Sequence, residues 1–107
     1  MSDDAQVIVR LAKRNLPVNT MKRVTYPPYD VLVVNVDGAY HAIEDACPHS
    51  GQSLSCGTLS GMSVVCAGHD WSVCLRTGRV LVPPMDAGNP VFEVRDEGEF
   101  VAILAPR

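Results

Sequence analysis

The chain has 107 residues, enough for one hydrophobic core but too few for a core and a separate catalytic domain. Nine basic and twelve acidic residues give a formal net charge of -3. Such a mild imbalance argues against nucleic acid as a partner and leaves protein partners open.

Short apolar segments separated by turn residues predict an all-β fold. The segments are rich in Val, Ile and aromatic residues, which favour strands. In chain order the expected strands are residues 7–9, 22–25, 30–35, 38–43, 62–66, 71–75, 90–95 and 99–104. This series predicts an antiparallel β sandwich or small barrel.

Turn signals support the same assignment. Asp37-Gly38 lies between two expected strands and predicts a tight hairpin, since Asp and Gly tolerate positive φ. Residues 96–98 (Asp-Glu-Gly) repeat the signal before the last strand. Helical periodicity extends over one turn at most, at residues 11–15, and ends before Pro17.

No segment has the features of a membrane span or a secretory signal. The longest apolar runs are strand-sized, far short of a bilayer-spanning helix. Residues 1–6 are acidic and polar, without a basic region followed by an apolar one. We therefore expect a cytoplasmic protein with no membrane association, in which thiols stay reduced and a Cys/His set is more typical of metal binding than of disulfides.

Four residues have the spacing of a metal site: Cys47-x-His49, sixteen intervening residues, then Cys66-x2-His69. Two thiolates and two imidazoles can surround a binuclear iron–sulfur cluster, with both Cys on one iron and both His on the other. A structural zinc site is the alternative, but zinc modules usually pair Cys with Cys and His with His. Here each half-site contains one of each, which favours the cluster because each loop can supply one ligand to each iron.

The motifs and their surroundings resemble the Rieske proteins. Residues 38–49 are similar to the family's strand and first cluster loop, and residues 66–74 to its second loop and exit strand. Residues 76–80 resemble a turn that often follows, and Pro83-Pro84 lie where the family has a loop that shields the cluster.

The resemblance implies a single Rieske domain over residues 1–107, with a cluster-binding subdomain of two loops inserted at about residues 45–84. It implies one [2Fe–2S] cluster per chain. The implied ligands are Cys47, His49, Cys66 and His69.

Departures from the high-potential members of the family imply a low reduction potential. Those members have a Ser two residues after the second ligand His and a Tyr two residues further, and this chain has Trp71 and Val73 there. Neither side chain can donate a hydroxyl hydrogen bond to sulfur, a contact that raises the potential. The disulfide that joins the two loops in those members would fall at Gln52 and Gly68 and is absent.

The remaining polar and sulfur-containing residues have ordinary explanations. We expect Cys56 and Cys74 to be small buried hydrophobic residues, and His41 to be a strand residue. Three acidic residues flank the ligands and are expected to be solvated loop charges, with an electrostatic docking face as the alternative. They are Glu44, Asp45 and Asp70.

The resemblance implies an electron-transfer ferredoxin rather than an enzyme. Such a protein takes single electrons from an NAD(P)H-dependent flavoprotein reductase and passes them to a terminal oxygenase, as in aromatic-ring-hydroxylating dioxygenase systems. We expect a monomer that binds both partners transiently. Two alternatives stay open: a small Rieske subunit of a larger oxidoreductase, such as assimilatory nitrite reductase, and a cluster-based redox sensor or binding module.

Overall fold

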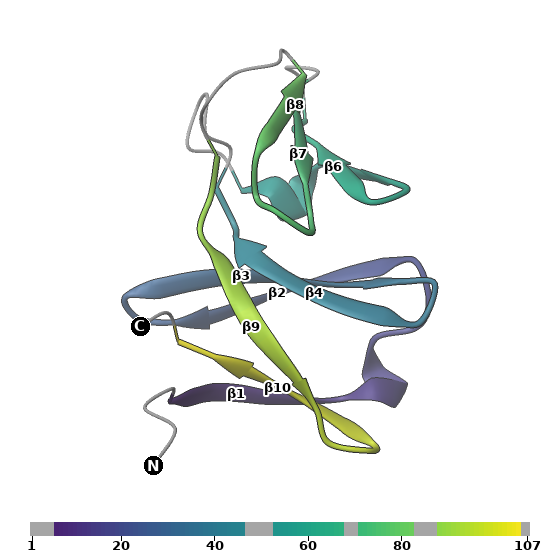
Figure 1. Ribbon diagram of the computed structural model, residues 1–107, viewed down its shortest axis with the longest axis vertical. Helices are drawn as coiled ribbons and strands as arrows, with labels where there is room; N and C mark the ends of the chain where they lie inside the picture. Colours follow the sequence, from purple (N-terminus) through teal and green to yellow (C-terminus); the bar gives the residue numbers. More distant parts are fainter. Residues whose placement is uncertain (1–5, 47–52, 68–70, 83–87, 106–107) are drawn as a thin grey trace.

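The computed structural model describes residues 6–46, 53–67, 71–82 and 88–105, which form two antiparallel sheets (Figure 1). The larger sheet has six strands in the order β1-β10-β9-β4-β3-β2 and curls into a nearly closed barrel. Its strands are β1 (Val7–Ala12), β2 (Thr20–Tyr26), β3 (Tyr29–Val36), β4 (Ala39–Glu44), β9 (Val91–Asp96) and β10 (Phe100–Leu104). None of the described residues belongs to a helix long and apolar enough to cross a bilayer.

The smaller sheet lies between β4 and β9 in the sequence and packs on one side of the larger sheet (Figure 1). It has four strands in the order β5-β6-β7-β8. Each strand has three residues: β5 (Thr58–Ser60), β6 (Ser63–Val65), β7 (Ser72–Cys74) and β8 (Val80–Val82). The all-β class expected from the sequence is confirmed.

All eight expected strands are present, and two further strands were missed. β5 and β8 contain only three residues each and, unlike β6 and β7, do not lie within a longer strand-like segment of the sequence. The single helical turn expected before Pro17 is the 3-10 turn η1 (Lys13–Asn15), and a second such turn, η2 (Leu54–Cys56), was not anticipated.

The predicted β3–β4 hairpin forms with the expected backbone. Asp37 and Gly38 have φ values of 52° and 94°. Asn35 closes the turn, because its Oδ1 accepts a hydrogen bond from the Gly38 N–H at 2.8 Å. The Asp37-Gly38 pair thus predicts this turn because both residues adopt the positive φ that the turn needs.

Strand β3 is buried on both faces and joins two hydrophobic clusters. Side chains alternate along a strand, so Val31 and Val33 point into the barrel while Leu32 and Val34 point toward the small sheet. All four are fully buried. This explains why the β3 sequence is a continuous apolar run rather than an alternating one.

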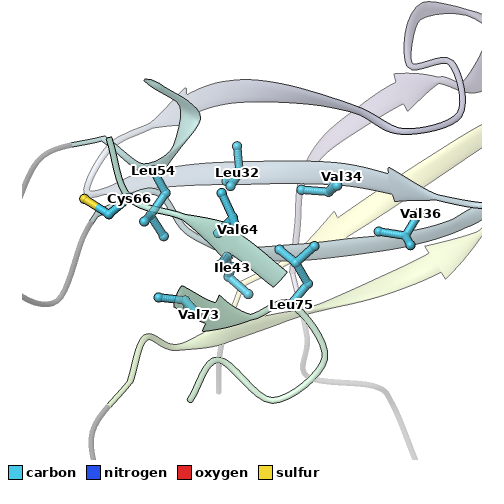
Figure 2. Close-up of a cluster of buried hydrophobic side chains, with 9 residues drawn as sticks. All are labelled: Leu32, Val34, Val36, Ile43, Leu54, Val64, Cys66, Val73 and Leu75. Carbon is cyan, nitrogen blue, oxygen red and sulfur yellow. The ribbon is translucent and has the colours of Figure 1, made fainter. Parts of the chain in front are cut away.

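The barrel cluster fills the larger sheet and consists of Ile8, Leu16, Val31, Val33, Ala42, Phe92 and Ile103. The interface cluster joins the two sheets and is drawn in Figure 2: Leu32, Val34, Val36, Ile43, Leu54, Val64, Cys66, Val73 and Leu75. More than half of the interface cluster comes from the chain between β4 and β9. The small sheet is therefore attached to the scaffold by shared apolar burial.

Candidate metal centre

Cys66 is the predicted ligand that lies among the described residues. It directly follows β6 and is 2% exposed, with its side chain in the interface cluster (Figure 2). The other predicted ligands, Cys47, His49 and His69, lie outside the described residues. So do several neighbours discussed above, namely Gln52, Gly68, Asp70, Pro83 and Pro84.

The second ligand segment is the loop of a β-hairpin. β6 and β7 pair in regular antiparallel register from Ser63↔Cys74 to Val65↔Ser72. One step further, the Cys66 N–H donates a hydrogen bond to the Trp71 carbonyl at 2.7 Å. The sheet thus fixes the backbone of Cys66, and His69 falls in sequence between the two residues that close the loop.

The first ligand segment, residues 47–52, is framed by the carboxylate of Asp45. Its Oδ1 accepts a hydrogen bond from the Ser55 N–H at 2.7 Å. Its Oδ2 accepts hydrogen bonds from the hydroxyls of Ser53 and Ser55, both at 2.9 Å. The residues on the two sides of the segment are therefore joined through one side chain.

Asn89 provides a second attachment for the start of the same segment. Its Nδ2 donates hydrogen bonds to the carbonyls of Glu44, at 3.0 Å, and Ala46. Its own N–H donates to the Gly78 carbonyl at 2.7 Å. Asn89 thus joins the end of β4 to the turn between β7 and β8.

Position 78 requires a glycine, because the backbone of Asn89 lies close against it. The φ of Gly78 is 77°, in the region that favours glycine. A Cβ at this position would lie 2.1 Å from the Asn89 carbonyl oxygen, well inside contact distance. A larger residue would force Asn89 away from the carbonyls that it holds.

The described part of the site fits an iron–sulfur cluster. Cys66 offers a soft thiolate ligand from a buried, apolar position, the kind of ligand that such clusters take. Leu54, which follows the first ligand segment by two residues, lies next to Cys66 in the interface cluster (Figure 2). The two predicted ligand segments therefore start or end at the same side of the small sheet.

The expectation that Asp45 is a solvated loop charge is wrong. Asp45 is 4% exposed, because its carboxylate is used for the hydrogen bonds to Ser53 and Ser55. It therefore cannot belong to an acidic docking face. Glu44 is partly exposed, and Asp70 lies outside the described residues.

The two residues that replace the hydroxyl donors of high-potential members lie in different surroundings. Trp71 is partly buried and packs against the interface cluster, while Val73 is fully buried inside it. A Tyr in place of Val73 would overfill this core. Position 71, at the edge of this cluster, is therefore the less disruptive of the two places for a hydroxyl residue.

The cysteines outside the ligand set are less buried than expected. Cys56 is exposed, because Leu54 takes the buried position of the η2 turn, and Cys74 is half-buried. Burial acts to raise the pKa of the Cys74 thiol. Hydrogen bonds from Thr77 and from the Arg76 backbone, together with the Arg76 charge, outweigh it and lower that pKa.

His41 is a half-buried strand residue, one of the two environments expected for it. Its Nε2 is buried without a hydrogen-bond partner among the described residues. Burial, and then the nearby Arg76 charge, lower the pKa of this imidazole. The side chain is therefore neutral at neutral pH.

Comparison with known proteins decides the family. Residues 6–103 match the Rieske [2Fe-2S] domain. The chain belongs to the Rieske [2Fe–2S] family. The cofactor implied by the Cys/His spacing is thus a Rieske cluster, which the donor chemistry at Cys66 fits.

Relatives of this Rieske chain include components of dioxygenase systems. The biphenyl dioxygenase ferredoxin subunit of Pseudomonas sp. strain KKS102 is 36% identical, covering 82% of each chain. A solved complex of reduced oxygenase and oxidized ferredoxin in carbazole 1,9a-dioxygenase contains a chain with a TM-score of 0.82 and 29% identity, covering 91% of this chain and 94% of that one.

The fold is also shared with a protein of another functional class. The putative NADH-dependent nitrite reductase small subunit from Mycobacterium tuberculosis matches with a TM-score of 0.83 and 20% identity, covering 98% of this chain and 99% of that one. At this identity the likeness concerns the fold alone, so the fold does not separate the two functional classes.

Proposed function

We propose that this chain is a ferredoxin that carries single electrons on one Rieske cluster to a terminal oxygenase of the aromatic-ring-hydroxylating type. The observation that carries the proposal is the match, over most of both chains, to a dioxygenase ferredoxin subunit at 36% identity. The ferredoxin–oxygenase complex of carbazole 1,9a-dioxygenase supports a direct contact between the two kinds of protein.

The proposed ligands are Cys47 and Cys66 on one iron and His49 and His69 on the other. When bound, the cluster supplies a site that accepts and releases one electron. The chain's own residues give this site a fixed frame: the β6–β7 hairpin positions Cys66, and Asp45 and Asn89 hold the ends of the other ligand segment.

The proposed electron donor is an NAD(P)H-dependent flavoprotein reductase, and the compartment is the cytoplasm. A monomer suits this shuttle, because one cluster must meet two partners in turn. Each contact should be transient and small. The proposed midpoint potential is low, near the -150 mV end of the Rieske range, because Trp71 and Val73 provide no hydroxyl to a cluster sulfur.

Reconstitution tests the proposal. The chain is mixed with NADH and the reductase of a biphenyl-type dioxygenase, and cluster reduction is followed by visible absorbance. Addition of the oxygenase and its aromatic substrate should reoxidise the cluster. Omission of either partner is the control and should stop the corresponding step.

The second candidate is a permanent small subunit of a larger oxidoreductase, since the fold, shared with the nitrite reductase small subunit, does not distinguish it from a shuttle. It predicts a stable complex that survives gel filtration with a large reductase. A chain that elutes alone and turns over with the dioxygenase components would exclude it. A chain that elutes only in such a complex and fails to reduce the oxygenase would overturn the shuttle.

A further inference from the structure

We propose that Asp45 is a positioning residue for the cluster, whose carboxylate fixes both ends of the segment that carries Cys47 and His49. The inference rests on the proposed function, since it assumes that these two residues are ligands. Asp45 precedes the first of them by two residues and does not itself need to touch the cluster.

The hydrogen bonds that the Asp45 carboxylate accepts from Ser53 and Ser55 all reach across the ligand segment. The three donors come from Ser53 and Ser55, on the far side of residues 47–52. A buried carboxylate needs such partners, because burial without them is strongly unfavourable. Hydrogen bonds to an ionised acceptor are also stronger than neutral ones. The two ends of the segment are therefore joined by hydrogen bonds, and losing them would leave a buried carboxylate without partners.

The same residue is attached to the scaffold. The Asp45 N–H donates to the Asp30 carbonyl at 2.9 Å, at the start of β3. The Arg23 guanidinium on β2 lies 3.4 Å from its Oδ2 and also 3.3 Å from the Asp30 carboxylate. Arg23 is half-exposed, is shared between two acids, and lies farther from the Asp45 carboxylate than the serine donors do, at 3.4 Å against 2.7–2.9 Å. The serine bonds are the main part of the attachment.

This arrangement reduces the conformational entropy that the ligand segment loses when the cluster binds. Closing a loop costs conformational entropy, and a loop whose ends are already joined has less to lose. Groups that orient metal ligands affect binding strongly, and their removal typically weakens metal affinity by about 10–100-fold. Asp45 should therefore slow the loss of the cluster and fix its environment.

The test is Asp45→Ala in the full, cluster-loaded protein. Cluster loss to an iron chelator is followed by bleaching of the visible absorbance, and the reduced protein is examined by EPR. We expect loss at least about tenfold faster than in the wild type. We also expect shifted or broadened EPR g values in the molecules that keep the cluster. Asp45→Asn keeps an acceptor for the Ser55 N–H and should restore much of the wild-type lifetime.

Asp30→Ala is the matched control. It removes the same charge next to the same Arg23, but Asp30 makes no side-chain bond to Ser53 or Ser55 among the described residues. It should keep the wild-type lifetime and g values. Equal effects in the two variants would show that Asp45 acts only through charge and would overturn the proposal.

Three outcomes remain distinct. A wild-type protein without a Rieske signal would contradict the proposed function itself. A normal wild type with an unchanged Asp45→Ala spectrum and lifetime would overturn only the role of Asp45. Faster loss with unchanged g values, matched by an equal drop in the stability of the metal-free protein, would reduce Asp45 to a structural residue.

If Asp45→Ala does not fold, Ser55→Ala is used in the same assay instead. This variant removes one of the three hydrogen bonds and leaves the Ser55 N–H in place. Loss should accelerate roughly threefold. Ser60→Ala, at an exposed serine on β5, is the control and should change nothing. Identical behaviour of the two serine variants would overturn the proposal.

Discussion

The two sheets differ in how they are held together. In the larger sheet, β1, β2, β3, β4, β9 and β10 have five to eight residues each and close around a cluster of their own. In the smaller sheet every strand has three residues, and its apolar side chains pack against the scaffold. Strands this short are not stable alone.

The difference indicates a division of roles. The scaffold has a core of its own, while the small sheet depends on the interface cluster and on the side-chain bonds of Asp45 and Asn89. A change in the small sheet can therefore disturb the site without weakening the scaffold. Each variant below should therefore affect one sheet more than the other.

The largest expected effect is complete loss of the cluster in Cys66→Ser, because a hydroxyl does not replace the buried thiolate. The protein should be colourless, with iron and acid-labile sulfide far below the wild-type value of about two each per chain. Far-UV circular dichroism should still report the scaffold strands. Cys56→Ser is the control: Cys56 is exposed, and its variant should stay red-brown. Coloured Cys66→Ser protein would contradict the assignment.

Two core variants should lower the free energy of unfolding by similar amounts but affect the cluster differently. Leu75 lies in the interface cluster and Ile103 in the barrel cluster, and both are fully buried. Each change to Ala should cost about 2–5 kcal/mol in denaturant unfolding. Only Leu75→Ala should also accelerate cluster loss under conditions where the scaffold stays folded. Equal acceleration by both would mean that the sheets unfold as one unit.

Two asparagine variants compare polar attachments in the same way. Asn89 binds the Glu44 and Ala46 carbonyls next to the ligand segment, while Asn35 is buried in the scaffold and binds the Leu16 carbonyl. Each change to Ala should lower the free energy of unfolding by about 1–3 kcal/mol. The chelator assay should separate them, with faster bleaching for Asn89→Ala alone. A normal cluster lifetime in that variant would show that Asn89 does not support the site.

The smallest effect concerns pH and His41. Its pKa is lowered in the folded state by burial and by Arg76, so the unfolded chain binds more protons below a pH of about 6.5. Stability should fall as the pH drops from there toward the folded pKa, and it should be independent of this group at higher pH. In His41→Gln the stability of the metal-free protein should vary less over this window. An unchanged slope would show that other groups control it.

Much of the scaffold could be predicted from the sequence, because its signals are local. The Asp37-Gly38 turn and the apolar run of β3 each have one structural solution. β5 and β8 were missed because each has only three residues and, unlike β6 and β7, neither lies within a longer strand-like segment of the sequence.

The spacing of Cys and His in the sequence led to the family, but not to the residues that support the site. Asp45 looked like a surface charge because nothing local shows that Ser53 and Ser55 fold back onto it. Asn89 lies 43 residues beyond Ala46, so its role depends on tertiary structure. The one signal that the sequence offered is an acid, Asp45, just before the ligand segment and two serines, Ser53 and Ser55, just after it.

The most direct test of the central claim, that the small sheet holds one single-electron Rieske centre, is an EPR-monitored redox titration of the purified chain. We predict a Rieske signal with one-electron dependence, about 59 mV per tenfold change in the ratio of the two forms. The midpoint should lie near -150 mV, and Trp71→Ser should raise it. A midpoint above zero would contradict the low-potential account, and a colourless protein containing zinc would contradict the claim itself.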